Sequence, residues 1–315
     1  MILGLDFLKD QNHSYKKEIG DKVAIIGGGN TAIDTARTLL RQGARPLIIY
    51  RRSREEMPAF EEEILQAEEE GIIFHYLTSP TDIIMDEEGK KINLGCVKMK
   101  LGEIDETGRR RPLSIKDSNF IIEVDSVISA IGEDPDLSFL PADIKTNKMG
   151  IVIDTNNATT CKGIFAGGDA AGRPRTVVSA IGSGKEGAYS IDRYLRGVKG
   201  EGEFNLSIVR YEDLNLDHFE KGNWVDPIKV AVEERINNLK EVYKGFSPEM
   251  GIIEASRCFS CGVCNMCDNC LIFCPDIAVL KKKKGYEINY DYCKGCLICV
   301  EECPRSAMTS IEEIK

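Results

Sequence analysis

One stretch near the N-terminus reads Lys22-Val23-Ala24-Ile25-Ile26-Gly27-Gly28-Gly29-Asn30-Thr31-Ala32. Its first five residues form an apolar run of the kind found in strands buried in a parallel sheet. The glycine-rich turn leads into a predicted helix, which runs to Gln42 and stops at Gly43. Glycine at the first and third turn positions lets the backbone approach a pyrophosphate, which N–H groups at the helix start then bind. The sequence therefore predicts an α/β, Rossmann-type dinucleotide-binding domain with the cofactor-binding residues Gly27, Gly29, Asn30, Thr31 and Ala32.

The end of the next predicted strand, residues 46–50, indicates which dinucleotide binds. An NAD site carries Asp or Glu about 20 residues after the glycine turn, where it accepts from the ribose 2′-hydroxyl. This chain has Arg51, Arg52 and Arg54 at that place. A carboxylate would repel a 2′-phosphate, whereas arginine binds one bidentately. The sequence favours NADP(H), with Arg51 and Arg52 as phosphate ligands; the alternative is a solvated surface cluster of arginines.

The following residues predict further α/β structure. We expect a helix over residues 58–70, a β-rich stretch over 72–128 and a buried strand over 127–132. After it we expect strands over residues 150–154 and 163–167 and a helix over 176–195. A charged helix is predicted over residues 230–243, within a linker that packs on its neighbours.

Ten of the twelve cysteines lie after residue 257, and eight of them form two copies of C-x2-C-x2-C-x3-C-P. This pattern holds [4Fe–4S] clusters in bacterial two-cluster ferredoxins, where the fourth cysteine of each run ligates the other cluster. Zinc and disulfides are alternatives, but a four-ligand zinc site gives no reason for a third evenly spaced cysteine and a Cys-Pro ending. The predicted ligands are Cys264, Cys267 and Cys270 with Cys303, and Cys293, Cys296 and Cys299 with Cys274.

Other cysteines and a basic run leave alternatives open. Cys258 and Cys261 extend the three-residue spacing of the cysteines upstream of Cys264. Three interpretations are open: an alternative frame of cluster ligands, a further metal site, or residues that serve only in packing. Cys96 and Cys161 are expected to be structural, because free cysteine behaves as a small hydrophobe. The run Lys281–Lys284 suits either a docking site for an acidic electron carrier or a solvated hairpin tip.

Composition limits the classes of partner. The chain has 315 residues and a formal charge of −10, which argues against nucleic acid binding. No apolar run approaches the ~20 residues that a membrane helix needs. The first residues are unlike a signal peptide, since Asp6 interrupts a short apolar run. Thiols kept as cluster ligands imply a reducing compartment, so we expect a cytoplasmic protein.

Residues 22–59, from the glycine turn through Tyr-Arg-Arg-Ser-Arg-Glu-Glu-Met-Pro-Ala, resemble the small subunit of NADPH-dependent glutamate synthase. They are equally similar to the NADPH-binding subunit of flavin-based ferredoxin:NADP transhydrogenases. The stretch Gly-Ile-Phe-Ala-Gly-Gly-Asp at residues 163–169 resembles the second FAD motif of this superfamily. The resemblance implies that Asp169 accepts from the ribityl chain of FAD and that the next helix points its N-terminus at the flavin ring. It also implies cofactor contacts from Gly132, Gly168, Thr176 and Val177.

In the family the FAD domain is discontinuous, and its first half precedes the NADP domain. That half carries the main FAD phosphate-binding Gly-x-Gly-x-x-Gly and an acidic ribose ligand, and this chain has neither. Residues 133–200 alone would expose a sheet edge and an apolar face. The resemblance therefore implies a partner subunit that supplies the missing half, or a gene start placed too late. The cysteine runs close this chain, whereas glutamate synthase carries its clusters at the front, so the resemblance favours exchange with a ferredoxin-like or other redox protein over glutamate synthesis.

The expected organisation has five parts: a crossover segment (1–19), an NADP(H)-binding domain (20–132), the second half of an FAD domain (133–200), a linker (201–250) and an α+β, bacterial-type 2[4Fe–4S] ferredoxin domain (251–315). We expect an oxidoreductase that passes electrons between NADPH, FAD and two [4Fe–4S] clusters. The alternative is a non-autonomous NADP(H)-binding and iron–sulfur relay subunit, whose flavin site another chain completes. Neither requires a catalytic acid or base, and the three histidines are scattered.

Overall fold

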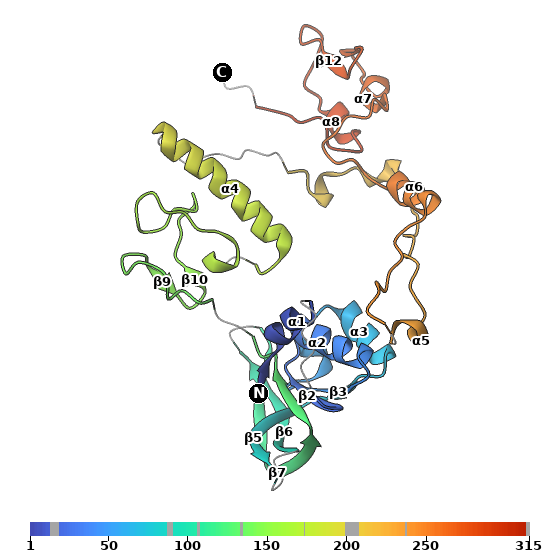
Figure 1. Ribbon diagram of the computed structural model, residues 1–315. Helices are drawn as coiled ribbons and strands as arrows, with labels where there is room; N and C mark the ends of the chain where they lie inside the picture. The colour runs from blue at the N-terminus through green and yellow to red at the C-terminus, as the bar shows by residue number, and fades with distance from the viewer. Residues whose placement is uncertain are drawn as a thin grey trace. The chain divides into compact units, whose positions relative to one another are not determined.

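The computed structural model describes residues 1–12, 19–86, 91–105, 108–132, 135–172, 174–198, 208–236 and 238–312 (Figure 1). The chain divides into two compact units. One comprises Met1–Asp134 and Ile228–Lys244, and the other comprises Pro135–Pro227 and Gly245–Lys315. No helix among the described residues is long and apolar enough to cross a membrane.

A five-stranded parallel sheet forms the centre of the first unit. Its strands, in spatial order, are β1 (Ile2–Leu3), β8 (Ser126–Ser129), β2 (Lys22–Ile26), β3 (Arg45–Ile49) and β4 (Ile73–His75). The predicted strand over residues 22–26 is confirmed as β2, and the strand predicted over 46–50 is β3, which begins one residue earlier. The strand order reverses beside β2, so the glycine turn lies where doubly wound sheets bind dinucleotides.

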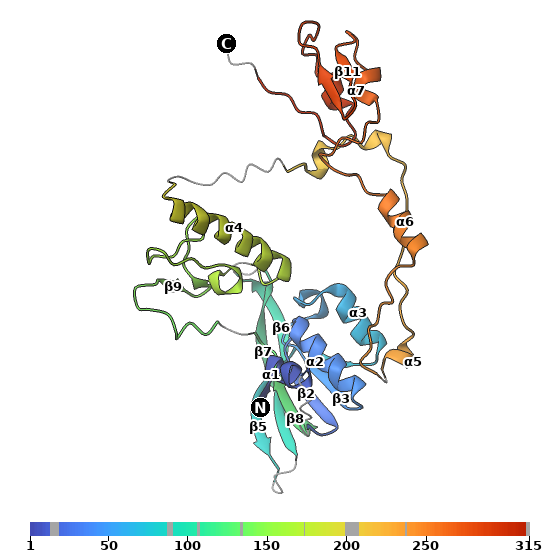
Figure 2. The same cartoon turned by 45° about the horizontal axis from the view of Figure 1, so that its top comes forward.

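Two layers cover this sheet (Figures 1 and 2). The helices α1 (Gly4–Asn12), α2 (Asn30–Arg41) and α3 (Glu61–Glu69) pack on one face. An antiparallel sheet of β5 (Thr78–Met85), β6 (Ile92–Ile104) and β7 (Arg110–Val124) packs on the other, as the β-rich prediction required. Along β2, Val23 and Ile25 face the helices and Ala24 faces the antiparallel sheet, all three fully buried.

The segment Ile228–Lys244 returns to this unit and packs on α3. The helix predicted over residues 230–243 is wrong: only α5 (Val232–Arg235) is helical, and Lys229 pairs with Tyr243 as an isolated antiparallel bridge. The charged residues of this segment form ion pairs with residues of α3 instead of lying along a helix of their own. Arg235, only 2% exposed, donates to Glu69 at 2.7 Å.

The second unit begins with a small β structure and a long helix. The strands β9 (Thr146–Asn147) and β10 (Gly150–Ile151) pair antiparallel, so the strand predicted over 150–154 is shorter than expected. The strand predicted over 163–167 is wrong, because only Phe165 pairs, in an isolated bridge with Ala158. The predicted helix over 176–195 is confirmed as α4 (Val177–Arg196). A 3-10 turn, η2 (Gly168–Ala171), precedes it.

The cysteine-rich part contains short elements joined by tight turns. These are α6 (Pro248–Ser256), α7 (Asn269–Ile272), β11 (Val279–Lys281), β12 (Tyr286–Ile288) and α8 (Ile298–Glu301). The strands β11 and β12 form a hairpin, and the last three lysines of the basic run lie at its tip. The cysteine runs begin the helices α7 and α8 in the same way, each after a left-handed residue, Asp268 and Leu297. The internal repeat of the sequence is thus a repeat of the backbone.

Candidate cofactor sites

The glycine turn after β2 accepts no side chain at its first two positions. Gly27 has φ +145°, and a Cβ there would lie 2.2 Å from the carbonyl oxygen of Ala130. A Cβ on Gly28 would lie 2.5 Å from the ring of Tyr50. Gly132, at φ +113°, lies three residues after the end of β8, and nothing lies within 4 Å of the position that a Cβ there would take. The turn therefore has the tight form that a phosphate-binding loop requires.

The third glycine faces open space. A Cβ on Gly29 would meet only Pro58, at 3.9 Å, so a ligand can reach this part of the backbone. The first turn of α2 contains no acidic residue. The N–H groups of Asn30 and Thr31 have no intrahelical acceptor, whereas Ala32 N–H donates to the carbonyl of Gly29 at 2.9 Å. Ala32 is fully buried, which lets α2 pack closely on β2, and the side-chain oxygen of Asn30 accepts from Phe60 N–H at 2.9 Å. This open, positively polarised helix start fits a pyrophosphate.

The three arginines after β3 lie in different surroundings. Arg51 is exposed and makes no hydrogen bond or ion pair with another described residue. Arg52 is only 4% exposed, and its guanidinium donates to Asp105 at 2.7 Å and to the carbonyl of Arg110 at 2.7 Å. Arg54 pairs with two glutamates of α3. Arg51 is thus available to a 2′-phosphate, while a contact from Arg52 would require its present bonds to give way.

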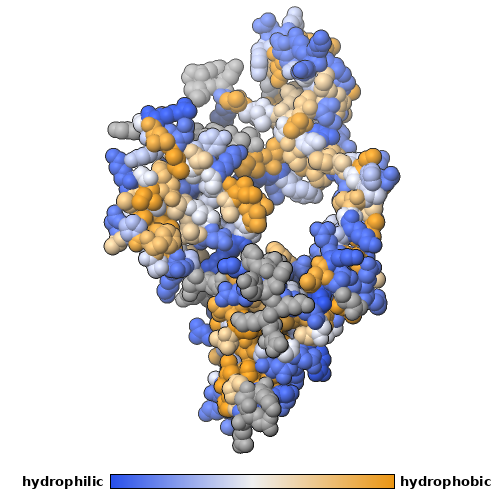
Figure 3. All heavy atoms as spheres, viewed as in Figure 1, coloured by the Kyte–Doolittle hydropathy of each residue, from blue (hydrophilic) through white to orange (hydrophobic). Residues whose placement is uncertain are grey.

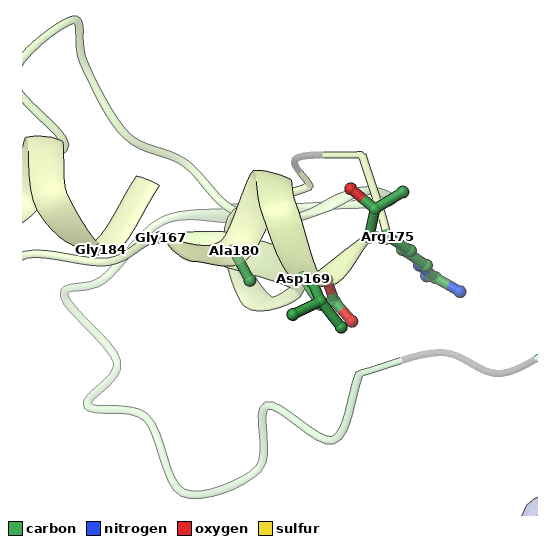
Figure 4. Close-up of a pocket in the computed structure, with 8 residues that line it drawn as sticks. Gly167, Asp169, Arg175, Ala180 and Gly184 are labelled. Atoms are coloured by element: carbon green, nitrogen blue, oxygen red, sulfur yellow. The ribbon is translucent and has the colours of Figure 1, made fainter. Parts of the chain in front are cut away.

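A recess of about 600 Å³ lies beside the start of α4 (Figure 4). The side chains of Asp169 and Arg175 lie at its rim. Gly168 has φ +60° and donates to the buried Ser183 hydroxyl at 3.1 Å, which holds η2 against α4. Thr176 caps α4 by accepting from Ser179 N–H at 3.1 Å. An exposed carboxylate beside a capped helix start fits a polyol and phosphate ligand.

The outer face of α4 is apolar, and no described residue covers it. Figure 3, in the view of Figure 1, shows apolar side chains beside polar ones on the surface of this part. Val178 is 81% exposed, Ile181 68% and Leu195 76%, and Ser183 is the helix's buried residue. An apolar face of this extent on a 20-residue helix is typical of a surface that another protein segment covers.

The first candidate cluster site contains cysteines from both runs. One apolar pocket is lined by Cys264, Cys267, Cys270 and Cys303, the set predicted from the spacing. Burial, together with the neighbouring cysteines of this set, raises the pKa of the Cys270 thiol to about 11. Four thiols that crowd one small apolar pocket fit the ligand shell of a [4Fe–4S] cluster.

The second set is related to the first by the internal repeat. Burial, then the charges of Cys293, Cys296 and Cys274, raise the pKa of the Cys299 thiol. Cys274 Sγ accepts from Ala278 N–H at 3.3 Å, and Cys303 Sγ accepts from Ala307 N–H at the same distance. Cys274 and Cys303 therefore each accept the same kind of hydrogen bond, from the backbone N–H of the residue four positions later.

The arrangement of the two cysteine sets favours a cluster over a single zinc ion. Among the described residues, no three His, Cys, Asp or Glu side chains are placed to hold one metal ion. Thiolates around a cubane bind separate iron atoms, so they surround a larger volume than ligands of a single zinc ion. Cys96 is fully buried, and burial raises the pKa of its thiol to about 11, in keeping with a structural role.

Sequence reasoning missed two residues around the first cluster site. Tyr286 and Arg305 line its pocket. The Tyr286 hydroxyl donates to Asp268 at 2.6 Å, beside the ligand Cys267. No motif marks a tyrosine on the hairpin strand β12, because its role depends on how the hairpin folds back over the first cysteine run.

Comparison with known proteins places the chain in a family. Residues 2–184 match the family described as "Pyridine nucleotide-disulphide oxidoreductase", and residues 286–309 match the "4Fe-4S binding domain". Over 272 residues the chain is 42% identical to the NADP(+)-dependent formate dehydrogenase subunit beta of Moorella thermoacetica, covering 82% of this chain and 38% of that protein. Over 295 residues it is 37% identical to the NADPH-Fe(3+) oxidoreductase subunit beta of Geobacter sulfurreducens, covering 82% and 44%. Over 183 residues it is 36% identical to the glutamate synthase [NADPH] small chain of Azospirillum brasilense, covering 56% and 38%. The chain thus spans less than half the length of these relatives.

Proposed function

Because this chain belongs to the pyridine nucleotide-disulphide oxidoreductase family, we propose that it passes electrons between NADPH, a flavin and two [4Fe–4S] clusters. The observation that carries the proposal is the crossed cysteine set around one pocket, in a chain that also contains an open phosphate-binding turn. The relatives named for NADP(+) or NADPH support the choice of nicotinamide cofactor.

The first unit binds NADP(H). The N–H groups at the start of α2 hold the pyrophosphate above Gly29, whose Cβ position is open. Arg51 neutralises the 2′-phosphate. Arg52 stabilises the same loop through its ion pair with Asp105. It contacts the 2′-phosphate directly only if that ion pair breaks. The chain supplies orientation and electrostatics, which is all that hydride transfer requires of the protein.

The second unit contributes part of the flavin site. Asp169 would accept hydrogen bonds from the polyol of FAD, and Thr176 and Val177, which line the same recess, would hold the flavin end of the cofactor. FAD, when bound, accepts a hydride and releases its electrons singly. We propose that residues outside this chain, on a partner subunit, complete the site and cover the exposed face of α4.

The cysteine-rich part carries electrons onward. The two crossed sets of four cysteines each hold a [4Fe–4S] cluster, which carries one electron at a time at a potential set by hydrogen bonds and exposure. The N–H···S bonds to Cys274 and Cys303 tune both sites alike. A ferredoxin-like or other redox protein is the proposed exchange partner.

A second candidate is a relay subunit without flavin activity of its own. The specific observation in its favour is the exposed apolar face of α4, because such a face is typical of a surface that another protein covers. In this case the chain binds NADP(H) and conducts electrons inside a larger complex.

The cofactor content of anaerobically purified chain tests both candidates. Iron analysis, the absorption spectrum and chromatography of released flavin are combined with a dye-reduction assay with NADPH. About eight irons, stoichiometric FAD and dye reduction without added protein support the self-sufficient enzyme. Eight irons with no flavin and no dye reduction support the relay subunit. A chain that holds zinc in place of iron would contradict the proposal.

A further inference from the structure

Three loops of the cysteine-rich part share one backbone pattern. In each, the residue two places after the first cysteine and the residue directly after the second have positive φ. The two cluster runs show it at Met266 (60°) and Asp268 (68°) and at Gly295 (67°) and Leu297 (61°). The third case is Cys258–Cys264, with Ser260 at 48° and Gly262 at 72°.

This agreement is unusual because non-glycine residues rarely have positive φ. Four of these six positions are not glycine. The third loop has this strained backbone at the same two positions as the two cluster loops. It therefore shares their backbone geometry as well as their cysteine spacing. Cys258 and Cys261 occupy the positions that ligands occupy in the other two loops.

The third loop also provides hydrogen bonds to sulfur. Cys258 Sγ accepts from Ser260 N–H at 3.4 Å and from the Ser260 hydroxyl at 3.8 Å. The crossing ligands Cys274 and Cys303 accept comparable N–H bonds at 3.3 Å. Bonds of this kind stabilise the thiolate form, which is the form that binds metal.

The backbone of the loop is held firmly, whereas its thiols face solvent. Gly262 N–H donates to the carbonyl of Arg305 at 2.6 Å, and Arg305 donates back to the carbonyl of Phe259. The ring of Phe259 packs edge-on against Phe219, with the ring centroids 4.7 Å apart. Cys258 and Cys261 are both exposed. The second cysteine run therefore fixes this loop through Arg305 without covering the two thiols.

The other cysteines cannot complete a cluster here. Cys264 lines the pocket of the first cluster set, so it is not available to the third loop. Among the described residues no third His, Cys, Asp or Glu joins the pair to hold a metal ion. The chain supplies two thiolates at this point.

We propose that Cys258 and Cys261 form a separate two-thiolate site for a thiolate-preferring divalent ion such as Zn²⁺. A Cys-x2-Cys pair is a common half of a tetrahedral zinc site. The remaining two positions are open to water or to ligands from another protein. The inference rests on the proposed function in one respect, because it compares this loop with the two proposed cluster loops. Iron content, measured in the same sample, tests the clusters separately from the zinc site.

Equilibrium dialysis of the anaerobically purified, cluster-containing chain against Zn²⁺ tests the site, with zinc and iron measured in the same sample. Wild type is expected to hold about one zinc per chain in addition to its iron. Cys258→Ser, Cys261→Ser and the double variant are expected to lose that zinc and keep their iron. Cys161→Ser, which removes a cysteine elsewhere in the chain, is the matched control and is expected to keep both.

Three results would overturn the proposal. Equal zinc in wild type and the double variant would place the bound ion elsewhere. Loss of iron in the double variant would make Cys258 and Cys261 cluster ligands. Thiols that react with an alkylating reagent only after chemical reduction would show a disulfide in place of a metal site.

Discussion

The guanidinium of Arg52 donates to the carboxylate of Asp105 at 2.7 Å, while its neighbour Arg51 is exposed. The pair joins the loop after β3 to the turn between β6 and β7, and a second pair, Arg110 with Glu56, joins the same two segments at 2.8 Å. Two adjacent arginines that look alike in the sequence therefore have different surroundings. Arg52 fixes the loop, whereas the side chain of Arg51 is open to solvent.

Replacing Arg51 by Gln is expected to weaken NADPH binding roughly 10- to 100-fold, the size of a lost hydrogen bond to a charged group. NADH binding should change little, because NADH has no 2′-phosphate. Arg52→Gln should weaken both nucleotides alike, since it disturbs the loop and leaves Asp105 without this partner. Titration of each variant with NADPH and NADH separates the two effects.

The control is Arg54→Gln, because Arg54 is occupied by Glu61 and Glu68. It should leave the ratio of NADPH to NADH affinity as in wild type. Equal loss of NADPH and NADH in Arg51→Gln would mean that Arg51 does not bind the 2′-phosphate. A selective loss of NADPH in Arg52→Gln would instead return Arg52 to the role that the sequence predicted.

The parallel sheet and the cysteine sets could be read from the sequence because each depends on local spacing. The apolar run of β2, the glycine turn and α2 are contiguous, and their periodicity suffices. The x3-Cys-Pro ending fixes the frame and predicts crossed ligation, which stays a prediction. In the structure, Cys264 and Cys303 share a pocket although 39 residues separate them in the sequence.

The secondary-structure predictions that were wrong share one physical cause. Contacts with residues far away in the sequence override the local sequence pattern. Residues 230–243 have the composition of a charged helix, but Arg235 is buried against Glu69 and Glu70, and Tyr243 accepts from Gln66 at 2.6 Å. The apolar run 163–167 resembles a strand, but among the described residues it has only the bridge from Phe165. A strand without a neighbouring strand has no ladder to stabilise it.

The buried carboxylate of Glu70 predicts a pH-dependent stability of the first unit. Its side chain is fully buried and lies 2.8 Å from Arg37, 3.2 Å from Arg41 and 3.5 Å from Arg235. Burial raises the pKa of Glu70, but hydrogen bonding and attraction from Arg37 outweigh it, so the pKa falls below the ordinary value of 4.5. Glu70→Gln is expected to cost about 1–3 kcal/mol at pH 7, because it removes the buried carboxylate that the three arginines share. Arg37 keeps its pair with Glu63 and Arg235 keeps its pair with Glu69.

The sign of the pH effect follows from the lowered pKa. Above the ordinary value of 4.5 the ionised Glu70 contributes its full stabilisation, which is lost as the pH falls through the folded-state pKa. The difference between wild type and Glu70→Gln should therefore narrow below pH 4.5. Hydrogen exchange of the α2 and α3 amides at neutral and acid pH measures this difference in stability. Glu61→Gln, at an exposed pair with Arg54, is the control and should change stability by less than about 1 kcal/mol at either pH.

The exposed face of α4 predicts a variant that affects assembly and not folding. Ile181 is 68% exposed, so Ile181→Glu should change the free energy of unfolding by only about 0.5 kcal/mol. If a partner covers this face, the new charge is buried there without a counter-ion and weakens the contact. The complex isolated from the cells that make it should contain less flavin and less partner, at unchanged iron. Ile181→Val keeps an apolar side chain and should behave as wild type; full flavin in Ile181→Glu would mean that this face stays uncovered.

Crossed ligation predicts which cysteine variants resemble each other. Cys303 lies in the second run but lines the pocket of the first set, so Cys303→Ala should damage the same cluster as Cys267→Ala. Cys274→Ala should likewise damage the same cluster as Cys296→Ala. Cys274 lies close enough to Cys299 of the second set for its charge to raise the pKa of that thiol. Each variant is expected to lose about four of eight irons, and low-temperature electron paramagnetic resonance of the reduced protein identifies the cluster that remains. If Cys303→Ala instead matched Cys296→Ala, each run would bind its own cluster, and the pocket shared by Cys264 and Cys303 would have another purpose.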